Sequence, residues 1–255
     1  MKLAWRKPSW LIVYGVLGYL LFLVVQVPAG FVWQQLPAGL TQRVAMNSLQ
    51  GSAWSATASG VRVNGQVLGN VTWSLHPLVL LTGRVGGAVR VRHPLGKVQA
   101  KLALDSGQRL ALRDVRGDFN AGLLDPLTRP VMLDGQIVLD LEAVRLQRGT
   151  LLEASGTVQW REAGVSGITD LPLGQIRIKA VPDNSGTRLQ VSNRDGAIEI
   201  NGVISVTPNG RYRLDLTLRN RDRKRKDLDT MLAMLGKADA TGRVKFRQAG
   251  VIPGF

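Results

Sequence analysis

The chain has 255 residues, of which 45% are hydrophobic, and it contains no cysteine. This length and composition predict one sizeable folded domain or two small ones, and they exclude a disordered chain. The absence of cysteine excludes thiol catalysis, disulfides and thiolate metal ligands, although it does not decide the compartment. The formal net charge of +15 favours a nucleic acid, an acidic membrane surface or an acidic protein as partner.

An uncharged stretch of 35 residues, from Pro8 to Gln42, follows a short basic leader. Residues 10–27 within it are mostly large and apolar, and as an α-helix they would rise about 27 Å, close to the roughly 30 Å hydrocarbon core of a bilayer. We therefore predict a transmembrane helix over 10–27. The side chains expected to form this membrane anchor are Trp10, Leu11, Ile12, Val13, Leu17, Leu20, Leu21, Phe22, Leu23, Val24 and Val25.

The charges around this segment are asymmetric, because the next charge after the basic leader is Arg43. The positive-inside rule therefore predicts a cytoplasmic leader over residues 1–9, a single pass through the bacterial inner membrane, and a periplasmic β-rich domain over 28–255. The residues that set this topology are Lys2, Arg6 and Lys7.

A cleaved signal peptide is the alternative interpretation of the N-terminal segment, because small residues occur at Ala29 and Gly30. The apolar run is longer than a usual signal core, and Pro28 with residues 31–33 makes a poor cleavage region, so a retained anchor is favoured. Both interpretations place the rest of the chain outside the cytoplasm. That placement argues against nucleic acid as the partner of the basic domain.

Beyond residue 55, apolar and polar residues alternate, which is the period of β-strands with one wet face. The pattern predicts a mainly β fold, in which one N-terminal transmembrane helix is followed by a curved, largely antiparallel β-sheet domain with a few short helices. Nine apolar residues are expected on one face: Leu102, Leu104, Ile137, Leu139, Leu141, Ile176, Ile178, Ile198 and Ile200. Five dipeptides that tolerate positive φ are predicted turns: Asn64-Gly65, Asp134-Gly135, Asp195-Gly196, Asn201-Gly202 and Asn209-Gly210.

Helix signals are few. An N-cap aspartate, an apolar stripe and a closing glycine predict a helix from Asp227 to Leu235, followed by Gly236. Shorter helical segments are expected within 34–47 and over 121–127. With so few helices available, the sequence leaves open whether a second element covers the apolar face or whether the sheet curls into an open trough.

Residue types that carry chemistry are sparse and scattered. The two histidines, His76 and His93, each precede a proline and are predicted to lie at turns or strand ends rather than to form a catalytic pair. The acidic residues lie singly among predicted strands, and the glycine-rich stretch 83–87 lacks the Lys-Ser/Thr of a phosphate-binding loop. We therefore expect no enzyme activity, no catalytic residue, no cofactor and no metal site.

The densest run of charge is basic and precedes the predicted C-terminal helix. Aromatic residues are not interleaved with it, so nothing supports base stacking on a nucleic acid. Two interpretations stay open: a solvated loop, or a contact with an acidic partner or anionic lipid head groups. The basic residues of this run are Arg219, Arg221, Arg223, Lys224, Arg225 and Lys226.

Short motifs recur along the chain. Gly-x-Val-x-Trp occurs at 69–73 and again at 156–160, which suggests a repetitive sheet. With Gly-Ser-Ala-Trp-Ser at 51–55 and the sequence LGNVTWSLHPL at 68–78, these segments resemble the type II secretion system protein N family, GspN, nearly from end to end. The resemblance implies an inner-membrane accessory component of the apparatus that exports folded proteins, with no catalytic residues to carry over.

The same resemblance implies a distant kinship with AsmA-like proteins, whose sheets form long apolar grooves. From the resemblance to the GspN family we expect a non-catalytic periplasmic interaction module. Its expected partners are inner-membrane lipids and other type II secretion components, in a homo-oligomer or a multi-protein assembly. The alternative is a lipid-binding or lipid-transfer protein that uses an apolar β-groove. An envelope hydrolase is disfavoured, because no catalytic constellation supports it.

Overall fold

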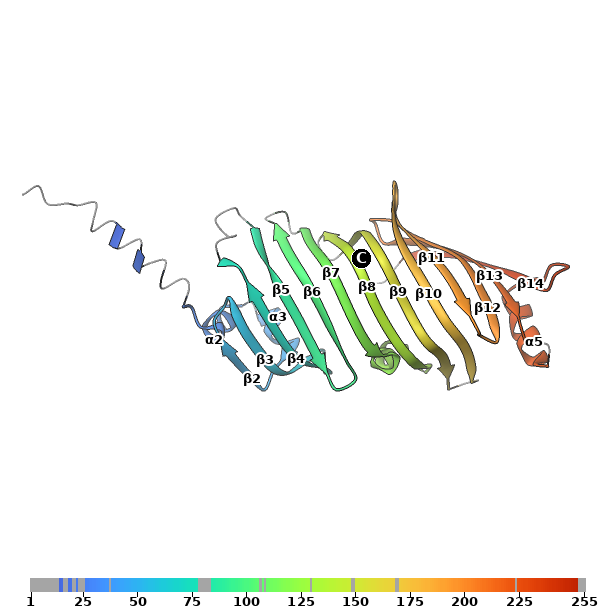
Figure 1. The fold of residues 1–255 in the computed structure, drawn as a ribbon, viewed down its shortest axis with the longest axis horizontal. Helices are drawn as coiled ribbons and strands as arrows, with labels where there is room; N and C mark the ends of the chain where they lie inside the picture. Colours follow the sequence, from blue (N-terminus) through green and yellow to red (C-terminus); the bar gives the residue numbers. More distant parts are fainter. Residues whose placement is uncertain are drawn as a thin grey trace, which may run out of the picture.

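One antiparallel β-sheet of 14 strands dominates the computed structural model (Figure 1). The structure describes residues 14, 15, 18, 19, 22, 26–36, 38–77, 84–105, 107, 109–128, 130–147, 150–167, 170–222 and 224–251. Strands β3 to β14 pair in chain order, and β1 and β2 both pair with β3. The strands are β1 (Val44–Ala45), β2 (Ser48–Gly51), β3 (Ser55–Val63), β4 (Gln66–Leu75), β5 (Arg84–His93), β6 (Gly96–Asp105), β7 (Arg109–Asn120), β8 (Met132–Gln147), β9 (Thr150–Ser166), β10 (Leu171–Asp183), β11 (Gly186–Arg194), β12 (Ile198–Val206), β13 (Arg211–Asn220) and β14 (Arg243–Val251).

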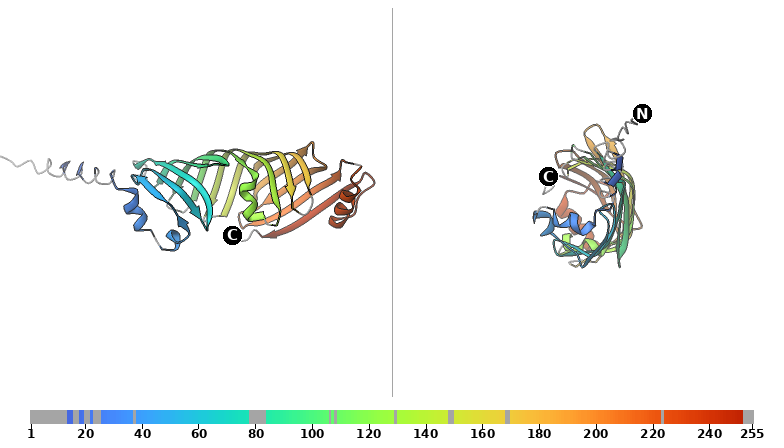
Figure 2. Two further views of the ribbon diagram at one scale, coloured as in Figure 1. Left: turned by 90° about the horizontal axis from the view of Figure 1, so that it is seen from below. Right: turned by 90° about the vertical axis from the view of Figure 1, so that its left-hand side faces the viewer.

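The helices are short and lie on one side of the sheet, inside its curve (Figure 2). Strand twist accumulates along a long meander, and a single sheet of this many strands curls rather than staying flat. The result is a trough whose outer, convex face is turned toward the viewer in Figure 1. The helices are α2 (Ala29–Gln34), α3 (Ala38–Thr41), η2 (Ala121–Leu124), α4 (Asp125–Thr128) and α5 (Lys226–Leu235).

The predicted mainly β, largely antiparallel fold is therefore confirmed. Among the described residues no second sheet covers the apolar face, so the trough is the alternative that the fold adopts. The C-terminal helix begins one residue before the predicted Asp227, which lies in its first turn. Gly236 follows the helix as predicted, but its φ of 165° is extended, so the helix does not end through a left-handed glycine.

Three of the five predicted turns connect strands: Asn64-Gly65, Asp195-Gly196 and Asn209-Gly210. The other two predictions are wrong, because Asp134-Gly135 lies within β8 and Asn201-Gly202 lies within β12. Gly135 has a φ of 101° at a β-bulge between β8 and β9. Gly202 is required by close packing, because a Cβ there would lie 2.2 Å from the Asp215 carbonyl oxygen.

The repeated Gly-x-Val-x-Trp motif has the same structure at both positions. Gly69 and Gly156 have positive φ, as β-bulges favour. The indole Nε1 of Trp73 donates to the Ala53 carbonyl oxygen at 3.0 Å, and that of Trp160 donates to the Asp134 carbonyl oxygen at 2.7 Å. The sequence similarity therefore reflects a recurring local structure, in which an indole is tied to the backbone of a preceding segment.

The predicted membrane-spanning segment 10–27 lies mostly outside the described residues. Of its expected anchor side chains, only Phe22 is described, and Lys2, Arg6 and Lys7 are not. Within the part of the chain that the structure describes, no helix has both the length and the apolar character needed to cross a bilayer. The expected span and its direction thus stay predictions.

Candidate functional site

The concave face of the sheet is apolar along its whole length. Directly opposed residues of antiparallel strands point to the same face, so the register aligns side chains into rows across the sheet. One row has a small or apolar residue on every strand from β2 to β14, and at about 4.8 Å per strand it spans roughly 58 Å. Its members are Leu49, Ala58, Val71, Val91, Val98, Gly117, Leu139, Val158, Ile178, Val191, Gly202, Leu216 and Phe246.

All nine apolar residues predicted to share a face lie on this concave side. Leu139 and Ile178 belong to the row itself. Each of the other seven lies an even number of residues from a member of the row on the same strand, so its side chain points to the same face. The alternation in the sequence therefore identified the inner face correctly. The physical reason is that the two-residue period of a strand permits only one assignment of faces when one side is apolar.

Helix α5 closes one end of the trough. Leu228 and Leu232 pack against Ile198, Leu218 and Val244, and these five residues form the main buried apolar cluster of the described chain. Leu228 and Leu232 are only 1% and 2% exposed. The last three strands therefore gain a hydrophobic core that the sheet cannot form by itself.

The middle of the trough is more open. A hollow of about 540 Å³ lies between β4, β5, β6 and η2, and its walls include Val67, Leu68, Val91, Phe119 and Leu124. Val67 is 53% exposed and Leu68 is 41% exposed. This part of the inner face is apolar and accessible.

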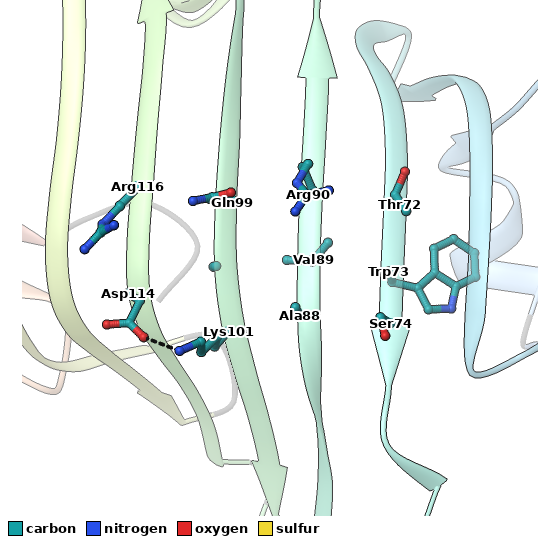
Figure 3. Close-up of a pocket in the computed structure, with 11 residues that line it drawn as sticks. Thr72, Trp73, Ser74, Ala88, Val89, Arg90, Gln99, Lys101, Asp114 and Arg116 are labelled. Atoms are coloured by element: carbon teal, nitrogen blue, oxygen red, sulfur yellow. Dashed lines mark ion pairs between the residues drawn. The ribbon is translucent and has the colours of Figure 1, made fainter.

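The convex face is polar and carries an excess of basic residues over β5, β6 and β7. Figure 3 shows Arg90, Gln99 and Arg116 side by side on these three strands, and the register pairs them directly. We call the following six exposed cations of these strands the basic strip: Arg90, Arg92, Lys97, Lys101, Arg113 and Arg116.

Two members of the basic strip have acidic partners. Lys101 forms an ion pair of 2.8 Å with Asp114, which Figure 3 marks, and Arg116 lies 3.9 Å from Asp140. The hydrogen bond from the Lys101 ammonium lowers the pKa of the Asp114 carboxyl, and the charge of Lys101 adds to that effect. Within the described chain, no carboxylate lies within 4.0 Å of the charged groups of the other four members.

Three cations of the basic run before α5 are engaged within the chain. Arg219 pairs with Glu199, and Arg225 pairs with Asp227 at 2.6 Å, which raises the pKa of Arg225 and lowers that of Asp227 through their hydrogen bond. The Arg221 guanidinium donates to the Asn193 carbonyl oxygen. Arg219 thus forms a cross-strand pair between β12 and β13, Arg221 ties the loop before α5 to β11, and Arg225 binds Asp227 in the first turn of α5.

The remaining cations of that run are exposed or undescribed. Lys224 and Lys226 are exposed, and Arg223 lies outside the described residues. The larger unneutralised basic surface is the strip on β5 to β7. Sequence inspection missed it because its members are spread over 27 residues, from Arg90 to Arg116, and only strand pairing brings them together.

The two histidines lie at opposite ends of one hairpin. The backbone N of His76 donates to Gly86, whereas His93 lies seven residues further along β5, roughly 24 Å away at the rise of a strand. His93 Nδ1 accepts a hydrogen bond from the Leu95 backbone N. The predicted strand-end positions are therefore confirmed, and the spacing rules out a catalytic pair. Among the described residues, no group of three or more His, Asp or Glu side chains is placed to hold a metal ion.

This architecture defines an extended β-sheet protein with two large and chemically contrasting surfaces. The sequence model of the family described as Type II secretion system (T2SS), protein N matches residues 42–247, and the chain belongs to this family. The family places it among the components of type II secretion, as the resemblance in its motifs predicted.

Three proteins named Type II secretion system protein N are similar to the chain over most of their length. The one from Vibrio cholerae is 25% identical over 236 residues, which cover 89% of this chain and 92% of the relative. That from Klebsiella pneumoniae is 26% identical and covers 91% of each chain, and that from Aeromonas hydrophila is 24% identical and covers 93% and 96%. No solved structure matches the chain.

Proposed function

We propose that this chain is a non-catalytic accessory component of the type II secretion apparatus, with a periplasmic sheet domain that supports export of folded proteins by binding other components. The observation that carries the proposal is that the family match spans nearly the whole sheet, from residue 42 before β1 to residue 247 within β14. That sheet presents two long faces instead of folding around one core. Such faces suit lateral contacts in a multi-protein assembly.

The proposal includes an inner-membrane anchor over residues 10–27, a cytoplasmic leader over 1–9 and the periplasmic domain over 28–255. The charge asymmetry of the sequence supports it. The described aromatic residues of the segment support it as well, since Tyr14, Tyr19 and Phe22 are 67%, 63% and 55% exposed and would be covered by lipid in a bilayer. The backbone N of Gln26 donates to the Phe22 carbonyl oxygen, which is an α-helical bond.

The lipid-handling alternative would depend on the open middle of the apolar trough. The matched relatives all carry the name of a secretion component, so the comparisons favour the secretion role. Within that role, the exposed Lys224 and Lys226 are proposed as an additional contact for an acidic partner or for lipid head groups.

Reporter fusions test the topology. An enzyme that is active only in the periplasm should be active when fused after Phe255, and the same enzyme fused after residue 9 should be inactive because the leader alone is not exported. Activity of a cytoplasm-specific reporter after Phe255 would contradict the proposed topology. A mature N-terminus near Gly30 would remove the anchor and leave the compartment unchanged.

Chemical crosslinking in intact envelopes tests the interaction role. The full-length chain, purified after crosslinking from cells with a working type II apparatus, should be joined to other components of that apparatus. Cells without the apparatus provide the control for nonspecific capture. Absence of any joined secretion component at native expression would contradict the proposed function.

A further inference from the structure

On the convex side of strands β5 to β7, two pairs of like charges face each other directly. Arg92 is opposite Lys97 across β5 and β6, and Lys101 is opposite Arg113 across β6 and β7. Cross-strand neighbours lie about 5 Å apart, and like charges directly opposite one another destabilise a sheet. A stable fold gains nothing from this arrangement, so each pair calls for a compensating partner.

The Lys101–Arg113 pair has a compensating partner within the chain. The register between β6 and β7 shifts at this point, and Asp114 in the bulge has a φ of 50°. The bulge places the carboxylate on the exposed face, 2.8 Å from the Lys101 amino group. A left-handed backbone is uncommon for a residue other than glycine, so the local structure accommodates strain and still neutralises this pair.

The Arg92–Lys97 pair has no such partner among the described residues. Asp118 is opposite Lys97 in the register, yet its carboxylate accepts a hydrogen bond from the Gln136 amide and makes no ion pair within 4.0 Å. Arg90 lies two residues before Arg92 on the same face of β5, and it also has no carboxylate within that distance. These three neighbouring cations thus form no ion pair within 4.0 Å among the described residues.

These three cations border a groove on the convex face. The groove has a volume of about 690 Å³, and its lining also includes Arg116, the neutral Gln99, and Asp118 and Asp140 toward β8. Its two rows of side chains are roughly 7 Å apart along the strands and its neighbouring strands are about 5 Å apart. A carboxylate that enters between the rows would therefore reach a guanidinium or ammonium group on either side.

We infer that the basic strip docks an acidic polypeptide segment of another component of the secretion apparatus; this inference rests on the proposed function and names the surface and the chemistry of the contact. Glutamate and aspartate side chains of the segment would pair with Arg90, Arg92 and Lys97, with arginine able to bind a carboxylate through two parallel hydrogen bonds. A planar membrane fits less well, because a flat surface touches the convex side of a trough only along a narrow line.

A binding titration on the full-length protein in phosphatidylcholine nanodiscs tests the inference. The probe is a fluorescent peptide of alternating glutamate and glycine, and the glutamine analogue of that peptide measures uncharged binding. The triple variant Arg90→Gln/Arg92→Gln/Lys97→Gln should bind the acidic peptide about tenfold more weakly than the wild type. Binding to the wild type should also weaken as salt rises, because exposed charges are screened over about 8 Å at physiological ionic strength.

The matched control removes three cations from the same convex face further along the sheet. Arg177, Lys179 and Lys245 are exposed, and none has an ion-pair partner among the described residues. The variant Arg177→Gln/Lys179→Gln/Lys245→Gln has the same net charge as the strip variant and should bind within about twofold of the wild type. Equal weakening by both triple variants would overturn the inference, because it would show a response to net charge alone. Strip-dependent binding of phosphatidylglycerol vesicles without binding of the acidic peptide would also overturn it.

A photoreactive residue in place of Gln99, in the centre of the strip, tests the contact in cells. In envelopes with a working apparatus it should crosslink to a secretion protein at a segment rich in aspartate and glutamate, and the strip variant should lose this product. If Gln99 gives no product while chemical crosslinking still joins the chain to secretion components, the inference fails and the proposed function stands. If neither method joins the chain to such a component, the proposed function fails as well.

Discussion

The sealed end of the trough and its open middle are built from the same kind of sheet but are buried very differently. At the end formed by β12 to β14, α5 packs on the sheet, and Leu228 of the helix and Val244 of β14 are only 1% and 2% exposed. In the middle, Leu104 is 39% exposed although it lies on the same inner face. Among the described residues, the most deeply buried leucines lie where α5 packs on the sheet. Stability should therefore be concentrated at this end, while the middle stays available for binding.

The largest expected contrast is between a buried leucine at the sealed end and a half-buried one in the middle. Leu228→Ala should lower the free energy of unfolding by about 3 kcal/mol, since it leaves a cavity under α5, whereas Leu139→Ala should cost only about 1 kcal/mol. Urea unfolding of the full-length protein in detergent measures both. Met234→Ala, on the exposed side of α5, is the control and should change little. Equal costs for Leu228 and Leu139 would show that the middle is closed in solution.

The second contrast concerns a buried amide beside the sealed end. Asn193 is 5% exposed, donates to the carbonyl oxygens of Leu173 and Ile198, and accepts from the backbone N of Ile200 at 2.7 Å. Asn193→Ala leaves these buried backbone groups without partners and should cost about 2 kcal/mol. Asn201→Ala, on the exposed face, should be nearly neutral in the same unfolding measurement. An Asn193 variant as stable as the wild type would mean that water replaces the amide.

The repeated indole bond should contribute the same free energy at its two positions. Trp73→Phe and Trp160→Phe keep an aromatic ring but remove the donor to the Ala53 and Asp134 carbonyl oxygens, so each should cost about 1 kcal/mol. Denaturation curves of the two single variants provide the comparison. A cost confined to one of them would show that the two motifs are not equivalent in structure.

A smaller effect of opposite sign is expected on the convex face. Lys97→Gln removes a cation directly opposite Arg92 and should raise the free energy of unfolding by about 0.5 kcal/mol. Lys179→Gln is the control, because its register partners are the uncharged Gln190 and Thr157. Destabilisation by Lys97→Gln would indicate that Lys97 has an internal structural role and would weaken the argument for an external partner.

The smallest effect is a pH dependence from the Asp114 ion pair. The pKa of Asp114 is lowered in the folded protein from an ordinary value of 3.8. A lowered folded pKa stabilises the fold above pH 3.8, and this contribution is lost as the pH falls further through the folded pKa. The acid-induced loss of stability in this range should therefore be slightly smaller in Asp114→Asn than in the wild type. Because Asp114 is exposed, solvent screening keeps the difference small.

Turn prediction shows where local sequence is sufficient and where it is not. Asn64-Gly65 was predicted correctly, since both residues have positive φ and join β3 directly to β4. Asn201-Gly202 has the same residue types and lies within β12, because the close approach of the Asp215 carbonyl oxygen requires a residue without a side chain. The residue types of a dipeptide limit its backbone conformations, and pairing with the neighbouring strand decides whether it forms a turn or part of a strand.

The sequence by itself determined the strands, the assignment of their apolar face, the positions of the C-terminal helix and the histidines, and the family. These follow from periods of two or four residues and from short motifs, which depend on nearby positions only. The tertiary structure alone decided that the sheet curls into a trough, that α5 seals one end, that Arg219 and Arg225 are used internally, and that the basic strip forms on β5 to β7. Those features depend on register between strands and on accumulated twist, because both bring together residues whose spacing along the chain carries no signal.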